Sequence, residues 1–444
     1  MPENKEDNTI NLIEKDSDYD ALAEKYLNVT AEHSCIIIHP YVKWGPQKVK
    51  TSSPQCLVDE AVALINSLQT WKVVDKIIVP LDTLQKKTLF GKGTLEKLKN
   101  IINRDSSITS VFINTSTLRN IQNEELERHF GKPIFDRYNI VMQIFSLHAI
   151  SKHAKLQVAL AELPFIQSRL RKHDTDFVVS AAVDTRNLIL QTREKKIKEE
   201  IKQLKSQREL LRYKRTKANF PVVAVVGYTN VGKTSLIKAL TGDKSLVPRN
   251  QLFATLDVTI HAGLLPSTLK VLYVDTVGFL YDIPTGLIEC SNATLEDAIL
   301  ADVILHVEDL SSKNFEHQRI HVFNTLENLS SKMGVTNIQK KLISVGNKCD
   351  IADESNKPTL RVSSTTEAGI DVLKHKLEET ILKVTDRHLL NISLPIGGDE
   401  VRWLYKNATV IGIKEDGENM ENNIVTIIIS EAKLSQFKYN FVNS

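Results

Sequence analysis

The fold is decided by one stretch, PVVAVVGYTNVGKTSLIKAL, which runs from Pro221 to Leu240. Its apolar, β-branched start, Pro221–Val226, predicts a buried strand. A loop that ends in Gly232, Lys233 and Thr234 follows, and Ser235–Leu240 then predicts a helix. A strand, a glycine-containing loop and a helix in this order are the setting of a phosphate-binding P-loop.

The residue types of this loop suit a nucleotide and its metal ion. Glycines let backbone N–H groups curl around a phosphate, and the helix N-terminus adds its dipole. We expect Lys233 to reach the β- and γ-phosphates and the Thr234 hydroxyl to ligate Mg²⁺. The predicted nucleotide contacts are Gly227, Tyr228, Thr229, Asn230, Val231, Gly232, Lys233, Thr234 and Ser235.

Three further segments follow in the order that a guanine-nucleotide site requires. The strand expected at Val271–Val274 ends in Asp275, Thr276, Val277 and Gly278, where Asp275 would hold Mg²⁺ through water and the Gly278 N–H would sense the γ-phosphate. The strand expected at Lys341–Val345 ends in Asn347, Lys348, Cys349 and Asp350. The last segment is Ser363 and Ser364, whose backbone would cap guanine O6.

The carboxylate of Asp350 sets the base preference. It can accept two hydrogen bonds from N1 and N2 of guanine, and adenine lacks that pair of donors, so we expect GTP and GDP as ligands rather than ATP. Lys348 would pack over the base.

The segment before Asp275 is expected to carry a switch threonine that covers Mg²⁺ and the γ-phosphate. Thr255 is the preferred residue, and Thr259 is the alternative. The predicted contacts of this segment are Phe253, Ala254, Thr255, Leu256 and Asp257. The predicted catalytic set is Lys233, Thr255 and Gly278, and the predicted metal ligands are Thr234, Thr255 and Asp275.

Two positions bear on the rate of hydrolysis. Many GTPases carry a water-orienting glutamine just after the Asp-x-x-Gly motif, and here that position is Phe279. We therefore expect slow intrinsic hydrolysis that a partner stimulates. Asn230 either helps to hold a K⁺ ion that acts as an arginine finger would, or only shapes the loop.

The remaining chain predicts a multidomain α/β protein. We expect disorder over residues 1–30, a parallel α/β domain over 31–150, a helical arm over 151–219, a central Ras-like P-loop G domain over 220–384 and a small α+β domain over 385–444. In the second of these, strands are expected at Cys35–Ile38, Lys76–Val79 and Ile108–Ile113, and helices at Val58–Leu68, Thr94–Ile102 and Ile121–Phe130.

The helical arm ends in a strongly basic stretch. Arg193–Lys217 holds eleven Lys or Arg and four Glu, a net charge of +7. Its apolar residues, Ile197, Ile201, Leu204 and Leu211, fall at the spacing of a helical hairpin or coiled-coil seam. The charge fits either a solvated helix face or an arm that contacts RNA phosphates.

Composition adds limits. The four cysteines, Cys35, Cys56, Cys290 and Cys349, form no CxxC pair, so we expect a reducing compartment and neither a disulfide framework nor a zinc site. No apolar run approaches the length of about 20 residues that a membrane span needs. The first 25 residues hold eight acids and three lysines, unlike a mitochondrial presequence.

Several further stretches resemble the HflX family of ribosome-associated GTPases. The resemblance rests on the P-loop together with LFATLD (252–257), VDTVGF (274–279), ATLEDA (293–298), ADVILHV (301–307), FGKGTLEKL (90–98), FDRY (135–138) and KLQVALAEL (155–163). WLYKNAT (403–409) is similar to the animal HflX-like proteins of mitochondria. One departure is that residues 171–190 contain no glycine, whereas bacterial members carry a glycine-rich stretch there.

The resemblance implies a GTPase that acts on the large ribosomal subunit and its rRNA, in late assembly or subunit separation. It implies a mitochondrial location, with the cytoplasm as the alternative that the acidic start leaves open, and a monomer away from the ribosome. Two other functions stay open: a ribosome-assembly chaperone that uses GTP only as a structural ligand, and a GTPase that supports tRNA modification.

Overall fold

The chain forms two compact units. The computed structural model describes residues 32–45, 53–170, 177–217, 220–248, 252–253, 258–280, 295–352, 360–417, 419 and 421–442. The first unit comprises Met1–Tyr213, Arg249–Asp257 and Leu280–Ala293. The second comprises Lys214–Pro248, Val258–Phe279 and Thr294–Ser444.

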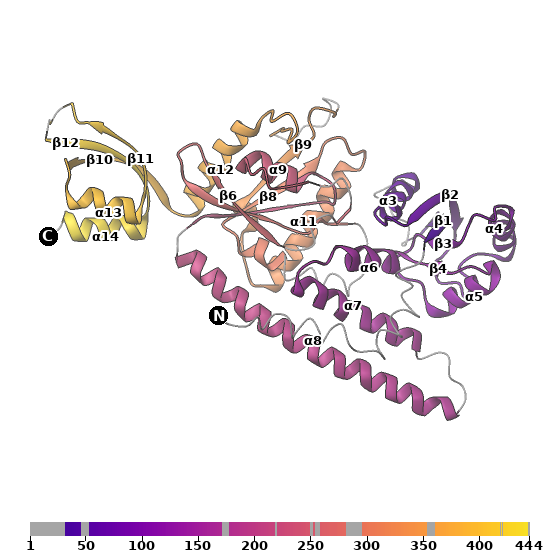
Figure 1. Ribbon diagram of the computed structural model, residues 1–444. Coiled ribbons are helices and arrows are strands. Elements are labelled where there is room, and N and C mark those ends of the chain that lie inside the picture. Colours follow the sequence, from indigo (N-terminus) through magenta and orange to yellow (C-terminus); the bar gives the residue numbers. More distant parts are fainter. Residues whose placement is uncertain are drawn as a thin grey trace. The chain divides into compact units, whose positions relative to one another are not determined.

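The first unit contains a parallel sheet with the strand order β2-β1-β3-β4 (Figure 1). Strands and helices alternate along the chain, which confirms the α/β class expected from the sequence. The elements are β1 (His33–Val42), α3 (Pro54–Asn66), β2 (Trp71–Leu81), α4 (Lys92–Arg104), β3 (Ser110–Ile113), α5 (Asn120–Phe130), β4 (Ile134–Phe135) and α6 (Arg137–His148).

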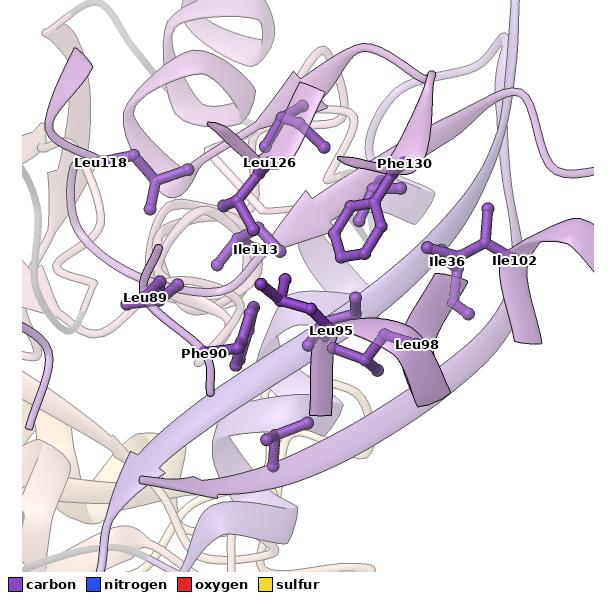
Figure 2. Close-up of a cluster of buried hydrophobic side chains, with 14 of the residues drawn as sticks. Ile36, Leu89, Phe90, Leu95, Leu98, Ile102, Ile113, Leu118, Leu126 and Phe130 are labelled. Carbon is purple, nitrogen blue, oxygen red and sulfur yellow. The ribbon is translucent and has the colours of Figure 1, made fainter. Parts of the chain in front are cut away.

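Both faces of this sheet are covered. Side chains alternate between the faces of a strand, and the consecutive residues Cys35, Ile36, Ile37 and Ile38 of β1 are all fully buried. Ile36 and Ile38 face α4 and α5, as Figure 2 shows for Ile36. Strand β2 differs from the expectation of a buried strand at Lys76–Val79: it lies at the edge of the sheet, and Lys76 is exposed.

The core between the sheet and the helix pair α4 and α5 explains why this region folds. Leu95, Leu98 and Ile102 recur along one face of α4 and pack with Leu126 and Phe130 of α5 (Figure 2). The Gly91-Lys92-Gly93 stretch lies at the start of α4, where Gly91 is the N-cap. A simple turn before a helix therefore accounts for these glycines.

Two helices follow, α7 (Lys152–Leu170) and α8 (Phe177–Lys217). Lys152 of α7 and Glu200 of α8 form an ion pair of 3.1 Å, so the helices lie side by side there. On α8, Leu190 and Ile197 are buried, whereas Ile201 and Leu204 of the expected seam are only partly buried.

The second unit contains the G domain. Its sheet has the order β6-β7-β5-β8-β9, in which only β6 runs antiparallel to its neighbour. The elements are β5 (Val222–Gly227), α9 (Lys233–Thr241), β6 (Thr259–Leu264), β7 (Lys270–Asp275), β8 (Val303–Asp309), α11 (Phe315–Lys332), the 3₁₀ helix η1 (Ile338–Lys341), β9 (Leu342–Asn347) and α12 (Ile370–Val384).

This topology brings distant motifs together. The carboxyl ends of parallel strands meet at one edge of a sheet, and ligands bind in the crevice outside that edge. The strands β5, β7, β8 and β9 end at Gly227, Asp275, Asp309 and Asn347. Their register pairs Asp275 with Val225, Gly227 with Val307 and Asp309 with Asn347, so the ends of neighbouring strands lie within two residues of one another.

The chain ends in a small antiparallel sheet of order β10-β12-β11. Its elements are β10 (Arg387–Pro395), α13 (Asp399–Asn407), β11 (Thr409–Glu415), β12 (Asn422–Ser430) and α14 (Glu431–Phe441). Alternate residues of β12, Val425, Ile427 and Ile429, pack with Leu404 of α13 and Phe437 of α14. Within the described ranges, no helix is long and apolar enough to cross a membrane.

Candidate nucleotide-binding site

The P-loop connects β5 to α9, as the sequence predicts. Gly232 is the N-cap of α9 and has φ of 90°, in the region that favours glycine. A Cβ atom there would lie 2.5 Å from Nδ2 of Asn347. Both the conformation and the close approach therefore require glycine at the position where the helix N-terminus would meet a phosphate.

Lys233 is buried within this loop. Its ammonium donates to the carbonyl oxygens of Tyr228, at 2.9 Å, and Gly227, at 3.3 Å. Burial lowers the pKa of Lys233 to about 8, and the Asp275 carboxylate partly offsets that shift. The negative charge of a phosphate would stabilise the charged ammonium further.

Thr234 and Asp275 come together at the edge of the sheet. The Thr234 hydroxyl donates to Oδ2 of Asp275 at 2.6 Å. Hydroxyl and carboxylate oxygens are hard donors that suit Mg²⁺, which takes only a few protein ligands and completes its shell with phosphate and water. These two residues therefore fit a nucleotide-bound magnesium ion, and they would hold it where it neutralises phosphate charge.

In the motif after β7, Thr276 belongs to the core and Gly278 lies against the P-loop. Thr276 is fully buried and its hydroxyl donates to the carbonyl of Val225 at 2.8 Å, so its side chain serves the fold. At Gly278 a Cβ atom would lie 2.8 Å from Cα of Thr229 and 3.0 Å from Nζ of Lys233. Gly278 therefore lies against the P-loop, where its backbone can respond to the γ-phosphate.

Asn347 ties the base-recognition segments to the P-loop. Its buried amide donates to the carbonyl of Val231 at 2.8 Å, and its Oδ1 accepts the N–H of Ser364 at 3.0 Å. The N–H of Cys349 donates to the carbonyl of Val362 at 3.1 Å. Asn347, Cys349 and Ser364 thus build one rigid frame for a base.

Lys348 and Asp350 lie on the rim of that frame. Lys348 has φ of 64°, and its ammonium donates to the carbonyl of Asn230 at 2.9 Å and to Asp309 at 2.7 Å. Lys348 therefore spans the rim between the P-loop and β8. Asp350 is exposed, which leaves it accessible to the N–H groups of a purine.

Comparisons with known proteins agree with this geometry. One family profile, described as 50S ribosome-binding GTPase, matches residues 222–348, and another, GTP-binding GTPase N-terminal, matches residues 56–146. Human GTP-binding protein 6 is 40% identical over 94% of this chain and 83% of that protein, and the Xenopus laevis protein is 39% identical over 89% and 78%. GTPase HflX of Caldanaerobacter subterraneus is 34% identical over 68% of this chain and 72% of that protein.

The chain belongs to the HflX family of GTPases. It hydrolyses GTP, as members of this family do, and nucleotide-dependent use of Mg²⁺ is general among such enzymes. The HflX resemblance drawn from the upstream stretches is thereby confirmed, because the N-terminal profile covers most of them.

Phe279 occupies a structural position in this HflX-family protein. Its side chain is only 4% exposed, its N–H donates to the carbonyl of Gly227 at 3.0 Å, and its carbonyl accepts the N–H of Thr229 at 2.7 Å. The residue extends the P-loop strand and carries no polar side-chain atom, so it cannot orient a water molecule.

The predicted switch segment is described only in part. Ala254, Thr255, Leu256 and Asp257 lie outside the described residues. Thr259, the alternative to Thr255, is the first residue of β6, pairs in register with Asp275, and lies with its hydroxyl 2.9 Å from Nε2 of His261. Phe253 is described, and it lies in the first unit rather than in the second.

One residue of the frame was missing from the sequence prediction. Asp309 holds the Lys348 ammonium, and its side chain is largely buried. The available signal was its position at the end of an apolar run, ADVILHVED (301–309), which β8 now explains. An acid at the carboxyl end of a parallel strand is placed beside the motif that ends the next strand.

Proposed function

We propose that this GTPase acts on the large ribosomal subunit, in late assembly or in the separation of subunits. Its GTP form binds the particle, and hydrolysis releases it. The proposed particle is the mitochondrial ribosome, as implied by the resemblance of WLYKNAT (403–409) to the animal HflX-like proteins of mitochondria, and the cytoplasmic ribosome is the alternative. The ribosome-binding description of the profile that matches the G domain supports this proposal.

The observation that carries the proposal is the charge on α8. Lys195, Lys196, Lys198, Lys202 and Lys205 lie on its exposed surface, while Ile197 is buried. A long helix with its apolar side packed and its basic side in solvent offers a row of cations to a phosphate backbone. Exposure of these lysines fits both a solvated helix face and an RNA contact, and we propose the RNA contact.

The site itself suggests why a partner is needed. Phe279 stands where a water-orienting glutamine would act, and its side chain is buried. Without a group to orient the attacking water, hydrolysis by the free protein is slow. The ribosomal particle supplies or positions that group.

Sedimentation with purified large subunits tests the nucleotide switch. The full chain is mixed with mitochondrial or cytoplasmic large subunits in GDP or in a non-hydrolysable GTP analogue. We expect co-sedimentation with the mitochondrial particle in the analogue and release in GDP. Equal binding in both nucleotides would contradict the switch. Binding only to the cytoplasmic large subunit would favour the cytoplasmic ribosome as the particle on which the protein acts.

A charge-reversal series tests the arm. Changing Lys195, Lys196 and Lys202 to Glu is expected to weaken particle binding and to flatten its salt dependence, because each lost phosphate contact removes about 0.7 to 0.9 from the slope of log K against log salt. The matched control changes Lys406, Lys414 and Lys438 of the C-terminal domain to Glu, which removes the same charge elsewhere. Equal loss in both variants would show a general charge effect only.

The monovalent ion is tested in the same assay. If Asn230 helps to hold K⁺ as a substitute for an arginine finger, particle-stimulated turnover falls when NaCl replaces KCl. If Asn230 only shapes the loop, the rates are equal. The Asn230 carbonyl accepts a hydrogen bond from the Lys348 ammonium, which is one way in which Asn230 shapes the loop. Equal rates in NaCl and KCl would mean that Asn230 has this structural role and does not hold K⁺.

A further inference from the structure

The ammonium of Lys348 joins two loops of the G domain that are far apart in the sequence. It donates to the carbonyl oxygen of Asn230 in the P-loop, at 2.9 Å, and to Oδ2 of Asp309, at 2.7 Å. Asp309 is the last residue of β8 and pairs in register with Asn347, which directly precedes Lys348. One side chain therefore links the phosphate-binding loop to the predicted base motif.

Two residues in this link have an uncommon backbone conformation. Asn230 has φ of 61° and Lys348 has φ of 64°, both in the left-handed region. Asparagine adopts this region more readily than most residues, whereas lysine does so rarely. Such conformations persist only where the surroundings fix them. The ammonium belongs to one of these residues and bonds to the backbone of the other, so it helps to hold both.

The carboxylate of Asp309 is itself held in place. Its Oδ1 accepts hydrogen bonds from the N–H of Ser311, at 2.9 Å, and from the Ser311 hydroxyl, at 2.6 Å. Its Oδ2 accepts from the Lys348 ammonium. The side chains of Asp309 and Lys348 are only 14% and 26% exposed. Water screens such a pair less than an exposed one, so the attraction is stronger than in a surface ion pair.

The link bears on the nucleotide because Lys348 is expected to pack over the base. A long side chain that a ligand must order loses rotational freedom, and this loss lowers the affinity. The bonds of the Lys348 ammonium are made to protein groups alone, so they do not require the nucleotide. They can therefore fix the side chain before the base arrives.

We propose that Asp309 is a positioning residue for guanine nucleotides: through Lys348 it holds the base motif and the P-loop in the conformation that binds the nucleotide. Its effect is the same for GDP and GTP, because both carry the base and the β-phosphate. The inference rests on Lys348 as the residue beside the base. It does not depend on the ribosome, so its failure would leave the proposed function untouched.

Nucleotide affinities of the full chain, without ribosomes, test this proposal. Asp309→Ala is expected to weaken binding of GDP and of β,γ-imido-GTP equally, by about 3- to 10-fold, the size expected for one long side chain that must be ordered on binding. The control is Asp371→Ala on α12, which removes an exposed carboxylate and should change neither affinity. Unchanged binding in Asp309→Ala, or an equal loss in both variants, would overturn the proposal.

A double-mutant cycle with Lys348→Met shows whether Asp309 acts through Lys348. Methionine keeps an apolar stem and has no ammonium to hold, so Asp309→Ala should cause no further loss of affinity in that background. The same loss in both backgrounds would mean that Asp309 acts through its turn with Ser311, and it would refute the proposed role.

Asp309→Asn keeps the proposal testable if the alanine variant does not fold. Asparagine retains one oxygen for the N–H of Ser311, and its amide group cannot accept from the Lys348 ammonium. We expect weaker GDP binding in the parent and no further loss in the Lys348→Met background. GDP binding as tight as in the parent protein would contradict a role for the Asp309 carboxylate.

Discussion

The hydroxyl of Thr234 and the carboxylate of Asp275 lie 2.6 Å apart, joined by a hydrogen bond between the first turn of α9 and the end of β7. The two residues are 41 positions apart in sequence, and the order of the sheet strands brings them together. Both are oxygen donors of the type that Mg²⁺ selects. This pairing fits a metal-dependent nucleotide site.

Loss of the Thr234 hydroxyl should remove most of the benefit of magnesium. In Thr234→Ala we expect the Mg²⁺-dependent part of the GDP affinity to fall by about 10- to 100-fold, as for other lost metal contacts. Thr234→Ser keeps a hydroxyl and should retain the Mg²⁺-dependent part of the GDP affinity. The measurement is the Kd for GDP with Mg²⁺ and with excess EDTA, and an unchanged ratio in Thr234→Ala would contradict the assignment.

A methyl group at Gly278 should disturb the contact with the P-loop. A Cβ atom there meets Cα of Thr229 at 2.8 Å, so the backbone must move. We expect kcat/KM for GTP to fall by about 10- to 100-fold, since small displacements of catalytic groups are costly. Gly93→Ala is the control, because its Cβ atom meets nothing within 4 Å. Equal activity of both variants would show that Gly278 is not part of the machinery.

Asp350 should determine the base. Asp350→Asn replaces a double acceptor with a mixed donor and acceptor, and we expect GTP affinity to fall by about 100-fold, in line with two hydrogen bonds to a charged group. Xanthosine triphosphate, which carries an oxygen in place of the 2-amino group, should gain affinity. Competition binding of the two nucleotides is the measurement, with Asp371→Asn on α12 as the control.

The buried pair of His306 and Glu308 should add no pH dependence to the free energy of unfolding between pH 4.5 and 6.5. Nδ1 of His306 lies 3.3 Å from Oε1 of Glu308. Burial raises the pKa of Glu308 from 4.5 to about 7 and lowers the pKa of His306 from 6.5 to about 3. Between pH 4.5 and 6.5 the folded pair holds one proton on Glu308, and the unfolded pair holds one on His306, so proton uptake balances.

Glu308→Gln removes one side of that balance. His306, whose pKa is lower in the folded state, then binds fewer protons than in the unfolded chain, so stability should rise with pH up to about 6.5. Urea unfolding at several pH values gives the difference in unfolding free energy between the variant and the parent. Parallel curves would contradict the pairing, and Glu327→Gln, at an exposed position on helix α11, is the control.

The placement of the candidate nucleotide motifs at strand ends was predictable because each motif follows an apolar, β-branched run. Such runs predict buried strands, and the ends of parallel strands gather at one edge. The pattern thus placed Gly227, Asp275 and Asn347 correctly at strand ends. The apolar pattern could not predict that the Thr276 side chain points into the core, because the presence of a threonine in the motif does not show which way its hydroxyl points.

Other features carried no local signal. Helix α6 was not predicted, since its residues from Arg137 to Phe145 are all buried and show no polar face with a helical period. Phe145 and Phe253 are in ring contact although they are more than 100 residues apart. From the sequence, Phe145 was expected in the α/β domain (31–150) and Phe253 in the G domain (220–384). Tertiary packing alone produces such a contact.

The central claim is that the large ribosomal subunit completes a GTPase site that Phe279 leaves unfinished. GTP turnover by the full chain, with and without purified large subunits in potassium buffer, tests it most directly. We expect slow turnover by the protein alone and strong stimulation by the particle, which the charge-reversed α8 variant should reduce. Tight GTP binding with no stimulation by either mitochondrial or cytoplasmic large subunits would contradict it.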